Sequence, residues 1–428
     1  MLSSLGRNRM LYLLPSSIGA TTGRAMVGND LFRKSAQCAF ATTSKNTESV
    51  STAFPAKVAV VGAGSFGSAM TRIIAKAIAP DGSERSTDIA WYARRSSIVE
   101  EINTQRTNSQ YLPGAVFPSH VKATSNLQEC IDGAGVIVLA IPTGFLPPLL
   151  EDLQLSPNSV VVSVLKSLKY SPNEQKMVTS VDIINQHLSE GKSNPPAAVV
   201  ALSGPNLYRE MVSDEEFAEA TIGYDDDNDE CQGNLEAARL VQRITSSSCF
   251  QTSLTNDRVG VELCGGLKNV FSLAVGYMEG LDLGWNARSA AMRAGQHEMA
   301  RFMNSRGMGV SSTVFETSAG VGDLVLTCTA GRGRTLAAAF VRDGLKKGFV
   351  STKDDSIERW EQLENTMLNG MKLPDWHNAQ YVHQALVDWN LTNDFPLLEA
   401  VYQIGFEGQH PKTIVDALSR SIVVADKK

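Results

Sequence analysis

The feature that most constrains this chain is an apolar run that ends in closely spaced glycines. The run KVAVVGAG begins at Lys57 and leads into the glycines of GAGSFG, Gly62, Gly64 and Gly67. A continuous β-branched run of this kind predicts a strand buried on both faces, as in a parallel sheet. The next segment, SAMTRIIAKAI, predicts a helix. The folded part of the chain should therefore begin with a strand, a tight turn and a helix.

This context gives the glycine loop a chemical role. Glycines at this spacing permit a tight turn, close approach of a pyrophosphate and packing of the helix on the strand. The N-terminus of the helix then favours the negative charge of the pyrophosphate. We predict a dinucleotide site formed by Gly62, Gly64, Ser65, Phe66 and Gly67. The alternative is a glycine-rich loop that binds no ligand.

Further apolar runs alternate with polar or helical stretches, which predicts an α/β, doubly wound domain of the Rossmann type. After the segment SLTNDRVG these runs stop. We expect Asp257 to open a long helical region, in which an apolar spacing near 3.6 predicts an all-α C-terminal domain. We expect a leader over residues 1–54, a dinucleotide-binding domain over 55–255 and a helical substrate domain over 256–428. The further runs are DIAWYA, GVIVLAIP, SVVVSVL and AAVVALSGP.

Composition narrows the range of partners. A net charge of −6 argues against binding to nucleic acid, which needs a concentrated basic surface. No apolar run approaches the roughly 18 residues that span a bilayer, so we expect no integral membrane segment. The six cysteines are scattered, with no close pair and no histidine at metal-ligand spacing. We therefore expect reduced thiols and no metal site.

The first fifty or so residues differ from the rest in charge. Basic residues outnumber acidic ones there, amid many Ser, Thr and Ala, a profile typical of an organelle transit peptide. The segment MLYLLPSSIGA competes as a signal-peptide core, but Pro15 and two serines weaken it. We predict a mitochondrial protein, with a plastid protein and a cytoplasmic protein carrying a disordered arm as the alternatives.

The end of the predicted second strand, WYARR, bears on the choice of cofactor. NAD enzymes of this fold commonly place an acidic residue here, on the ribose 2′-hydroxyl. This chain has Arg94 and Arg95 instead, and arginine can accommodate the 2′-phosphate of NADP. Two arginines that simply face solvent are an equal alternative.

Lys268 and Asn269 lie in a predicted helix that is otherwise nearly all apolar or small. Burial of an ammonium group is costly without partners and tends to lower its pKa, which suits a lysine that donates or accepts a proton. The alternative is a lysine whose charged end reaches the surface.

The segment GDLVLTCTAGRGR contains a third group of polar residues. Asp323 and Thr327 share one helical face at i, i+4, and the glycine turn presents Arg332 and Arg334. An acid can orient a lysine, and guanidinium groups can hold a phosphate with paired hydrogen bonds. A plain connection between two helices is the alternative for the basic turn.

The motifs GAGSFG, YLPG, LSGPN, VELCGGLKN and GDLVLTCTAGRGR occur together and in the order found in NAD(P)-dependent glycerol-3-phosphate dehydrogenases. The chain resembles this family from Lys57 to the late segment EGQHPKTIVDAL. The resemblance implies a homodimer that uses NAD(H), with NADP(H) left open by Arg94. It also implies a small phosphorylated substrate: hydride transfer reduces dihydroxyacetone phosphate reversibly to sn-glycerol 3-phosphate.

The resemblance also implies roles for individual residues. The residues it implies in catalysis are Lys268, Asp323 and Lys166, the last in the segment VLKSLKY. The residues it implies in substrate binding are Asn269, Thr327 and Arg332. Arg332 is expected to contact the cofactor as well.

Three departures from the family pattern bear on the site. Ser167 stands where the family usually has glycine after the first lysine, and Gly333 replaces an asparagine after the phosphate-binding arginine. A glutamine of the late cofactor-covering loop is not recognisable near GMKLPDW. We therefore expect the phosphate and cofactor contacts to be weaker or differently assembled. Two other functions remain open: a different Rossmann-type hydroxy-acid dehydrogenase, and a non-catalytic dinucleotide-sensing protein.

Overall fold

The computed structural model describes residues 54–79, 87–151, 153–189, 196–225, 232–349, 352–368 and 372–426. The predicted leader, residues 1–54, lies outside these ranges except for Phe54.

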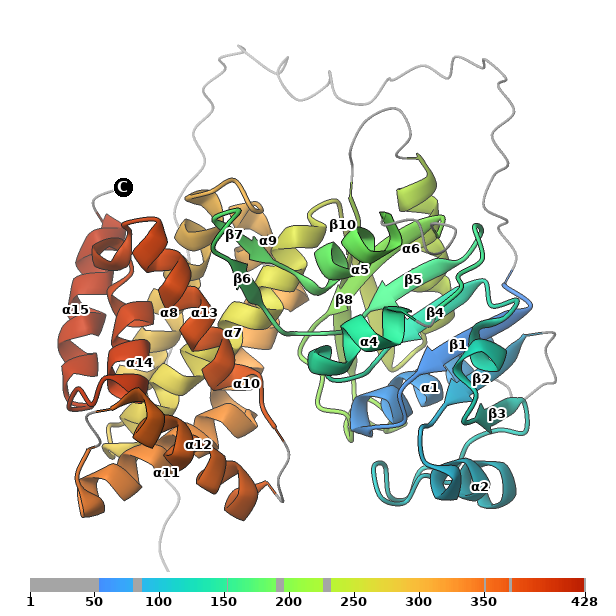
Figure 1. Ribbon diagram of the computed structural model, residues 1–428, viewed down its shortest axis with the longest axis horizontal. Helices are drawn as coiled ribbons and strands as arrows, with labels where there is room; N and C mark the ends of the chain where they lie inside the picture. Colours follow the sequence, from blue (N-terminus) through green and yellow to red (C-terminus); the bar gives the residue numbers. More distant parts are fainter. Residues whose placement is uncertain are drawn as a thin grey trace, which may run out of the picture. The chain divides into compact units, whose positions relative to one another are not determined.

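The N-terminal part of the described chain is built on one eight-stranded sheet (Figure 1). The strand order is β10-β9-β8-β5-β4-β1-β2-β3, and neighbouring strands run parallel except β8 and β9, which are antiparallel. All five predicted strands form, as β1, β2, β4, β5 and β8. The strands are β1 Lys57–Val61, β2 Asp88–Tyr92, β3 Val121–Thr124, β4 Val136–Leu139, β5 Val160–Ser163, β8 Ala198–Ser203, β9 Ala218–Gly223 and β10 Phe250–Thr255.

Both faces of this sheet are buried, which confirms the predicted doubly wound fold. Strand β1 is an example. Val58 and Val60 pack into one hydrophobic core, while Ala59 and Val61 pack into a second core. Alternate residues of a strand point to opposite faces, so a run without polar residues requires cover on both sides. The covering helices are α1 Ser65–Ile78, α2 Ser96–Gln105, α3 Leu127–Ile131, α4 Leu146–Glu151, α5 Ser180–Ser189 and α6 Gln232–Thr245. A hairpin of β6 Lys169–Ser171 and β7 Lys176–Val178 precedes α5.

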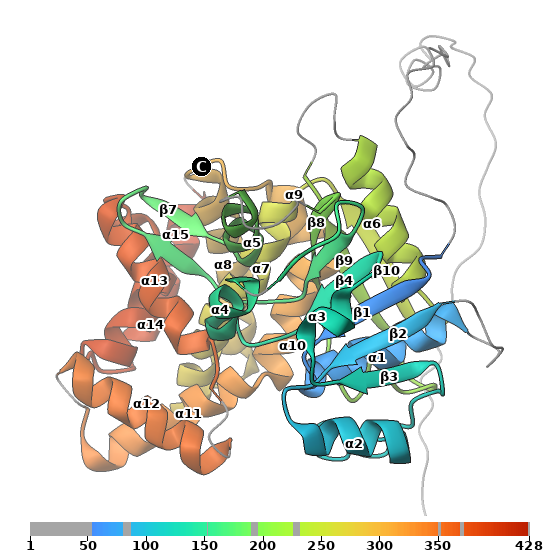
Figure 2. The same ribbon diagram turned by 45° about the vertical axis from the view of Figure 1, so that its right-hand side comes forward.

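From α7 onward the described chain is helical (Figure 2). The predicted start at Asp257 is confirmed, because its side chain caps α7 by accepting a hydrogen bond from the Gly260 N–H at 3.0 Å. The division at residue 255, the last residue of β10, stays a prediction. The helices are α7 Arg258–Gly280, α8 Trp285–Asn304, α9 Ser311–Glu316, α10 Asp323–Ala330, α11 Arg332–Lys347, α12 Lys353–Met367, α13 Asp375–Asp388, α14 Pro396–Phe406 and α15 Thr413–Asp426, with a π-helical turn Ser318–Gly322 before α10 and short 3-10 turns Thr143–Phe145 and Thr392–Asp394.

Helix α7 is the centre of this helical part. Gly276 lets α11 approach closely, since a Cβ atom there would lie 2.3 Å from the Arg334 carbonyl oxygen. Among the described residues, α7 alone is long and apolar enough to suit a membrane span, and 94% of its apolar window is buried inside the chain. Burial of this kind is what the core helix of a globular domain requires.

Candidate active site

The glycine loop follows β1, and its three glycines serve different purposes. Gly62 has φ +119°, and a Cβ atom there would lie 2.4 Å from the Ala140 carbonyl oxygen. A Cβ atom on Gly67 would lie 2.0 Å from the Gly62 carbonyl oxygen. Apart from the neighbouring residues in the chain, no described atom comes within 4 Å of the Cβ position of Gly64, which caps α1. The outer glycines therefore close the turn, while Gly64 leaves open space at the helix N-terminus, which fits the approach of a pyrophosphate. Ser65 and Phe66 follow as the first residues of α1.

The two arginines after β2 have different surroundings. The Arg94 guanidinium lies over the ring of Phe145, 5.7 Å from its centroid, and Phe145 ends the short turn that follows β4. Arg95 instead donates hydrogen bonds to Gln110 and to the Tyr111 hydroxyl, at 3.0 and 2.6 Å. Arg94 is thus the arginine that faces the loops at the carboxyl ends of two strands, where folds of this kind bind their ligands.

Asp323 is the centre of a buried cluster. It is 1% exposed and forms ion pairs with Lys268, itself 4% exposed, and with Lys166, whose Nζ lies 2.8 Å from Oδ2. Ser203 donates to Oδ2 and Thr327 donates to Oδ1, both at 3.4 Å. The structure therefore brings together four of the predicted residues, Lys166, Lys268, Asp323 and Thr327, from widely separated parts of the chain.

The charge of Lys268 is easier to remove than that of an ordinary lysine. Burial lowers its pKa, the carboxylate of Asp323 opposes this, and the positive charge of Lys166 lowers it further. An ammonium group with a lowered pKa can release and regain a proton near neutral pH. The cluster can thus supply a proton donor held in place by a carboxylate.

Two adjacent glycines on α7 let the Lys166 loop reach the cluster. A Cβ atom on Gly266 would lie 2.3 Å from Cγ of Leu168. On Gly265 it would lie 3.1 Å from the Ser203 hydroxyl and 3.5 Å from Cγ of Lys166. The segment CGGLKN therefore combines a flat helix surface with the lysine that the surface presents.

Asn378 on α13 ties this loop to α7, and its role was missed from the sequence. Its Nδ2 donates to the carbonyl oxygens of Lys166 and Gly266 at 3.3 and 3.1 Å, and its Oδ1 accepts from the Leu168 N–H at 3.1 Å. No pattern in the sequence marks this asparagine. Ser203 was also missed, although the motif LSGPN that contains it could have indicated it.

The remaining predicted substrate residues lie on α7 and α11. Asn269 follows Lys268 and is 6% exposed, and Arg332 is the first residue of α11. Arg334 forms an ion pair with Glu279, which lies near the C-terminal end of α7. Arg332 and Lys268 both act electrostatically on the carboxyl of Asp375, which connects the arginine to the cluster.

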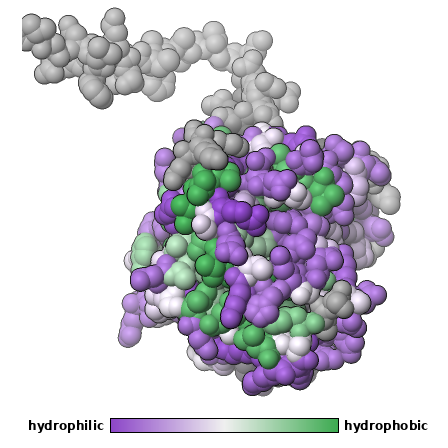
Figure 3. Space-filling model, turned by 90° about the vertical axis from the view of Figure 1, so that its left-hand side faces the viewer, coloured by the Kyte–Doolittle hydropathy of each residue, from purple (hydrophilic) through white to green (hydrophobic). Residues whose placement is uncertain are grey.

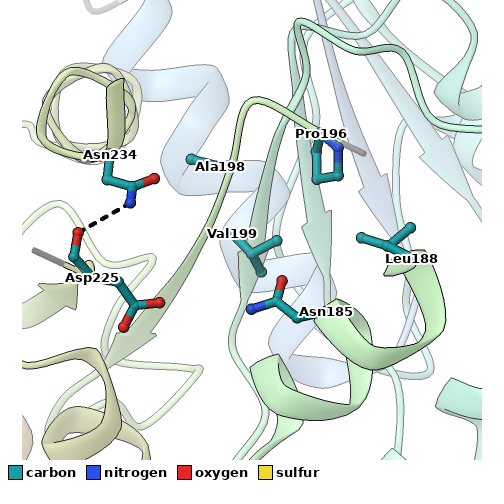
Figure 4. Close-up of a pocket in the computed structure, with 7 residues that line it drawn as sticks. All are labelled: Asn185, Leu188, Pro196, Ala198, Val199, Asp225 and Asn234. Atoms are coloured by element: carbon teal, nitrogen blue, oxygen red, sulfur yellow. Dashed lines mark hydrogen bonds between the residues drawn. The ribbon is translucent and has the colours of Figure 1, made fainter. Parts of the chain in front are cut away.

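A separate polar cavity of about 260 Å³ lies at the other end of β8 (Figure 4). It is lined by Ala198, the first residue of β8, whereas Ser203 at the last position of that strand contacts Asp323. Asn234 lines the cavity and donates a hydrogen bond to the Asp225 carbonyl oxygen at 3.1 Å. This cavity is therefore distinct from the cluster.

Family models match most of this chain. The N-terminal model of NAD-dependent glycerol-3-phosphate dehydrogenase matches residues 57–230, and the C-terminal model matches residues 257–416. The glycerol-3-phosphate dehydrogenase 1-like protein of Xenopus tropicalis is 32% identical over 85% of this chain and 97% of its own length. The cytoplasmic NAD(+) glycerol-3-phosphate dehydrogenase of Homo sapiens is 32% identical over 82% of this chain and 94% of its own length.

Solved structures agree. Glycerol-3-phosphate dehydrogenase from Plasmodium falciparum has a TM-score of 0.73 at 27% identity, covering 85% of this chain and 95% of its own. The enzyme from Saccharomyces cerevisiae has a TM-score of 0.71 at 27% identity, covering 85% and 99%. The fold and these matches define a dinucleotide-linked dehydrogenase. More particularly, the chain belongs to the NAD-dependent glycerol-3-phosphate dehydrogenase family.

Proposed function

We propose that this chain is an NAD-dependent glycerol-3-phosphate dehydrogenase that interconverts dihydroxyacetone phosphate and sn-glycerol 3-phosphate. Its membership of the family supports both the reaction and the cofactor, NAD(H). The observation that carries the proposal is the ion-paired arrangement of Lys166 and Lys268 around the buried Asp323. Such a group can stabilise the negative charge that develops on the substrate C2 oxygen during hydride transfer.

Each residue of the cluster has a proposed task. The bound nicotinamide supplies or accepts the hydride. Lys268 donates a proton to the C2 oxygen during reduction and removes it during oxidation, for which its lowered pKa is suited. Asp323 holds the ammonium groups of Lys268 and Lys166 in place, and Thr327 helps to orient Asp323 and contacts the substrate.

The phosphate of the substrate is assigned to Arg332 and Asn269. Arg332 opens α11, so the phosphate would also meet the first turn of a helix, where negative charge is favoured. A guanidinium can bind phosphate through two parallel hydrogen bonds. A substrate held by its phosphate keeps its carbonyl group close to Lys268. Such positioning can supply a large part of an enzymatic rate enhancement.

The cofactor is assigned to the glycine loop. Gly62, Gly64 and Gly67 with Ser65 and Phe66 would hold the pyrophosphate, and the open space beside Gly64 supports this. Arg94 would lie near the ribose, and we propose that NADPH is usable beside NADH because no carboxylate repels its 2′-phosphate there. Arg332 is proposed to reach the cofactor as well as the substrate.

We propose a homodimer in a mitochondrion, with plastid and cytoplasm as the alternatives. The helical part carries exposed apolar side chains, among them Val387, Val415 and Val423, and Figure 3 shows hydrophobic patches between hydrophilic ones on one face of the molecule. Light scattering of the purified chain measures its oligomeric state.

Attachment of residues 1–54 to a fluorescent protein tests the proposed mitochondrial location, and cytoplasmic fluorescence would agree with relatives that are named cytoplasmic.

The reaction is tested by absorbance at the nicotinamide band, with dihydroxyacetone phosphate and either NADH or NADPH. Consumption of NADH supports the proposal. Turnover of a 3-hydroxy acid with NAD(+) but not of glycerol 3-phosphate would instead indicate another dehydrogenase. Binding of NADH without turnover of any of these substrates would indicate a dinucleotide-sensing protein.

A further inference from the structure

A second buried carboxylate lies beside the cluster, against the first turn of α11. A Cβ atom placed on Gly333 would lie 1.8 Å from Oδ1 of Asp375, so this oxygen occupies the space that a larger side chain would need. Asp375 is the first residue of α13 and is only 5% exposed. A carboxyl group thus replaces the side chain that Gly333 lacks, next to Arg332.

The surroundings of Asp375 place it between the phosphate end and the catalytic end of the site. The charged groups that act on it, among the described residues, are Arg332 from α11 and Lys268 from α7. Ser272, one turn beyond Lys268 on α7, donates a hydrogen bond to Oδ1 at 3.5 Å. Burial raises the pKa of Asp375 to about 6, against the opposing effect of the two cations. Its carboxyl therefore changes charge close to neutral pH.

We propose that Asp375 makes binding of the substrate phosphate depend on a proton, because the ionised carboxylate and the phosphate compete for the same cations. This inference rests on the proposed function, which places the phosphate against Arg332. In a site shielded from water, two such anions repel each other strongly. Protonation of Asp375 removes the repulsion and leaves a hydroxyl that can donate a hydrogen bond to the phosphate.

The charges of the site support this assignment. With Lys268 protonated, three cations, Lys166, Lys268 and Arg332, face two carboxylates, Asp323 and Asp375. The site then carries one net positive charge, and a phosphate dianion would leave it with one net negative charge. Uptake of one proton by Asp375 restores neutrality. Asp323 already forms ion pairs with two lysines, so Asp375 is the carboxylate that can accept the proton.

The expected size follows from the fraction of protein in the competent form. With a pKa of about 6, Asp375 is protonated in about one tenth of the molecules at pH 7 and about one hundredth at pH 8. The apparent Kd for the phosphorylated substrate should therefore rise by up to about tenfold for each pH unit above 6. The second ionisation of the phosphate itself, near pH 6, affects every variant equally.

The test is calorimetric titration of sn-glycerol 3-phosphate into the full chain saturated with NADH. Both compounds are reduced, so no turnover takes place. Measurements at pH 6, 7 and 8, each in two buffers of different ionisation enthalpy, give the Kd and the number of protons taken up. The variants are Asp375→Asn, which keeps the shape of the side chain, and Asp416→Asn on the exposed face of α15 as the control.

We expect Asp375 to contribute nearly one proton to the uptake in the wild type and in Asp416→Asn at pH 7 and above; Lys268, whose pKa is also lowered, adds its own uptake, which remains in Asp375→Asn. Asp375→Asn should therefore take up fewer protons than the wild type and bind more tightly at pH 8 by tens of fold. Equal uptake in wild type and Asp375→Asn would overturn the inference, as would weaker binding of Asp375→Asn at every pH, which would mean that Asp375 orients Arg332. If the wild type neither binds glycerol 3-phosphate nor reduces dihydroxyacetone phosphate, the proposed function itself fails.

A second route covers the case in which Asp375→Asn does not fold. The double variant Gly333→Ala/Asp375→Ala fills the space of the carboxylate with a methyl group, and its binding of glycerol 3-phosphate should lose the part of the pH dependence that Asp375 contributes. Gly333→Ala alone should lower Tm, because its Cβ atom meets Asp375. If Gly333→Ala lowers Tm as much in the Asp375→Ala background as in the wild type, the contact is not as described.

Discussion

The glycine loop and the Asp323 cluster are two halves of one proposed site, and they are built by opposite means. The loop uses backbone: Gly62 and Gly67 have no room for a side chain, and Gly64 leaves its surroundings open. The cluster uses side chains that come from β8, α7, α10 and the segment after β5. A backbone site depends on the absence of side chains within a single turn, whereas a side-chain cluster depends on partners up to 157 residues apart.

The largest effect should come from the cluster. Lys268→Ala removes the proposed proton donor and should lower kcat by roughly 10²–10⁴, with NADH affinity nearly unchanged. Steady-state kinetics and NADH fluorescence titration measure the two quantities. Lys122→Ala, at an exposed position of β3, is the matched control. A near-normal kcat in Lys268→Ala would show that Lys268 has a structural role only, and the Asp323 cluster would then not be the catalytic half of the site.

Arg332 tests whether the cluster extends to the phosphate. Arg332→Ala loses a charge-assisted contact worth about 1.5–3 kcal/mol. KM for dihydroxyacetone phosphate should rise by about 10–150-fold, and the preference over unphosphorylated dihydroxyacetone should shrink. Arg342→Ala, on the same helix and 48% exposed at its side chain, is the control. Undiminished discrimination between the two ketones in Arg332→Ala would place the phosphate elsewhere.

Two alanine substitutions separate the roles of the glycines within the loop. Gly67→Ala forces a Cβ atom against the Gly62 carbonyl oxygen and should lower the free energy of unfolding by about 1–3 kcal/mol. Gly64 has φ −77°, which alanine adopts readily, so Gly64→Ala should keep its stability and weaken NADH binding. Urea unfolding and NADH titration distinguish the outcomes. Unchanged NADH affinity in Gly64→Ala would argue against a pyrophosphate at this turn.

The smallest effect concerns the ribose end. Arg94→Asp should reduce kcat/KM with NADPH several-fold more than with NADH, since a carboxylate repels the 2′-phosphate and an exposed guanidinium contributes only a screened attraction. Arg95→Asp makes the same charge change at a residue engaged with Gln110 and Tyr111, so it should discriminate less. The difference in kcat/KM with NADPH between the wild type and Arg94→Asp should narrow at high ionic strength, because salt screens both the attraction and the repulsion. Equal losses with both cofactors in Arg94→Asp would show that Arg94 does not contact the ribose.

Two departures from the family pattern, Ser167 and Gly333, have different consequences in the structure. Ser167 does not prevent Lys166 from reaching Asp323, at 2.8 Å. Gly333 does remove a side chain, and the space is filled by Asp375 from a helix 42 positions further along the chain. The family pattern indicates where a side chain is missing, but it does not indicate which residue takes its place.

The sequence by itself determined the buried parallel strands, the glycine loop and the change to helices at Asp257. These features depend on side-chain period, on φ and on caps, all of which act within a few residues. Through motifs it also indicated Lys268, Asp323 and Lys166. Only the tertiary structure decided that Asn378 joins the Lys166 loop to α7 and that the carboxyl of Asp375 lies against Gly333, next to Arg332 in the chain. Such contacts join helices whose packing depends on the whole core, and the spacing of residues along a chain does not specify them.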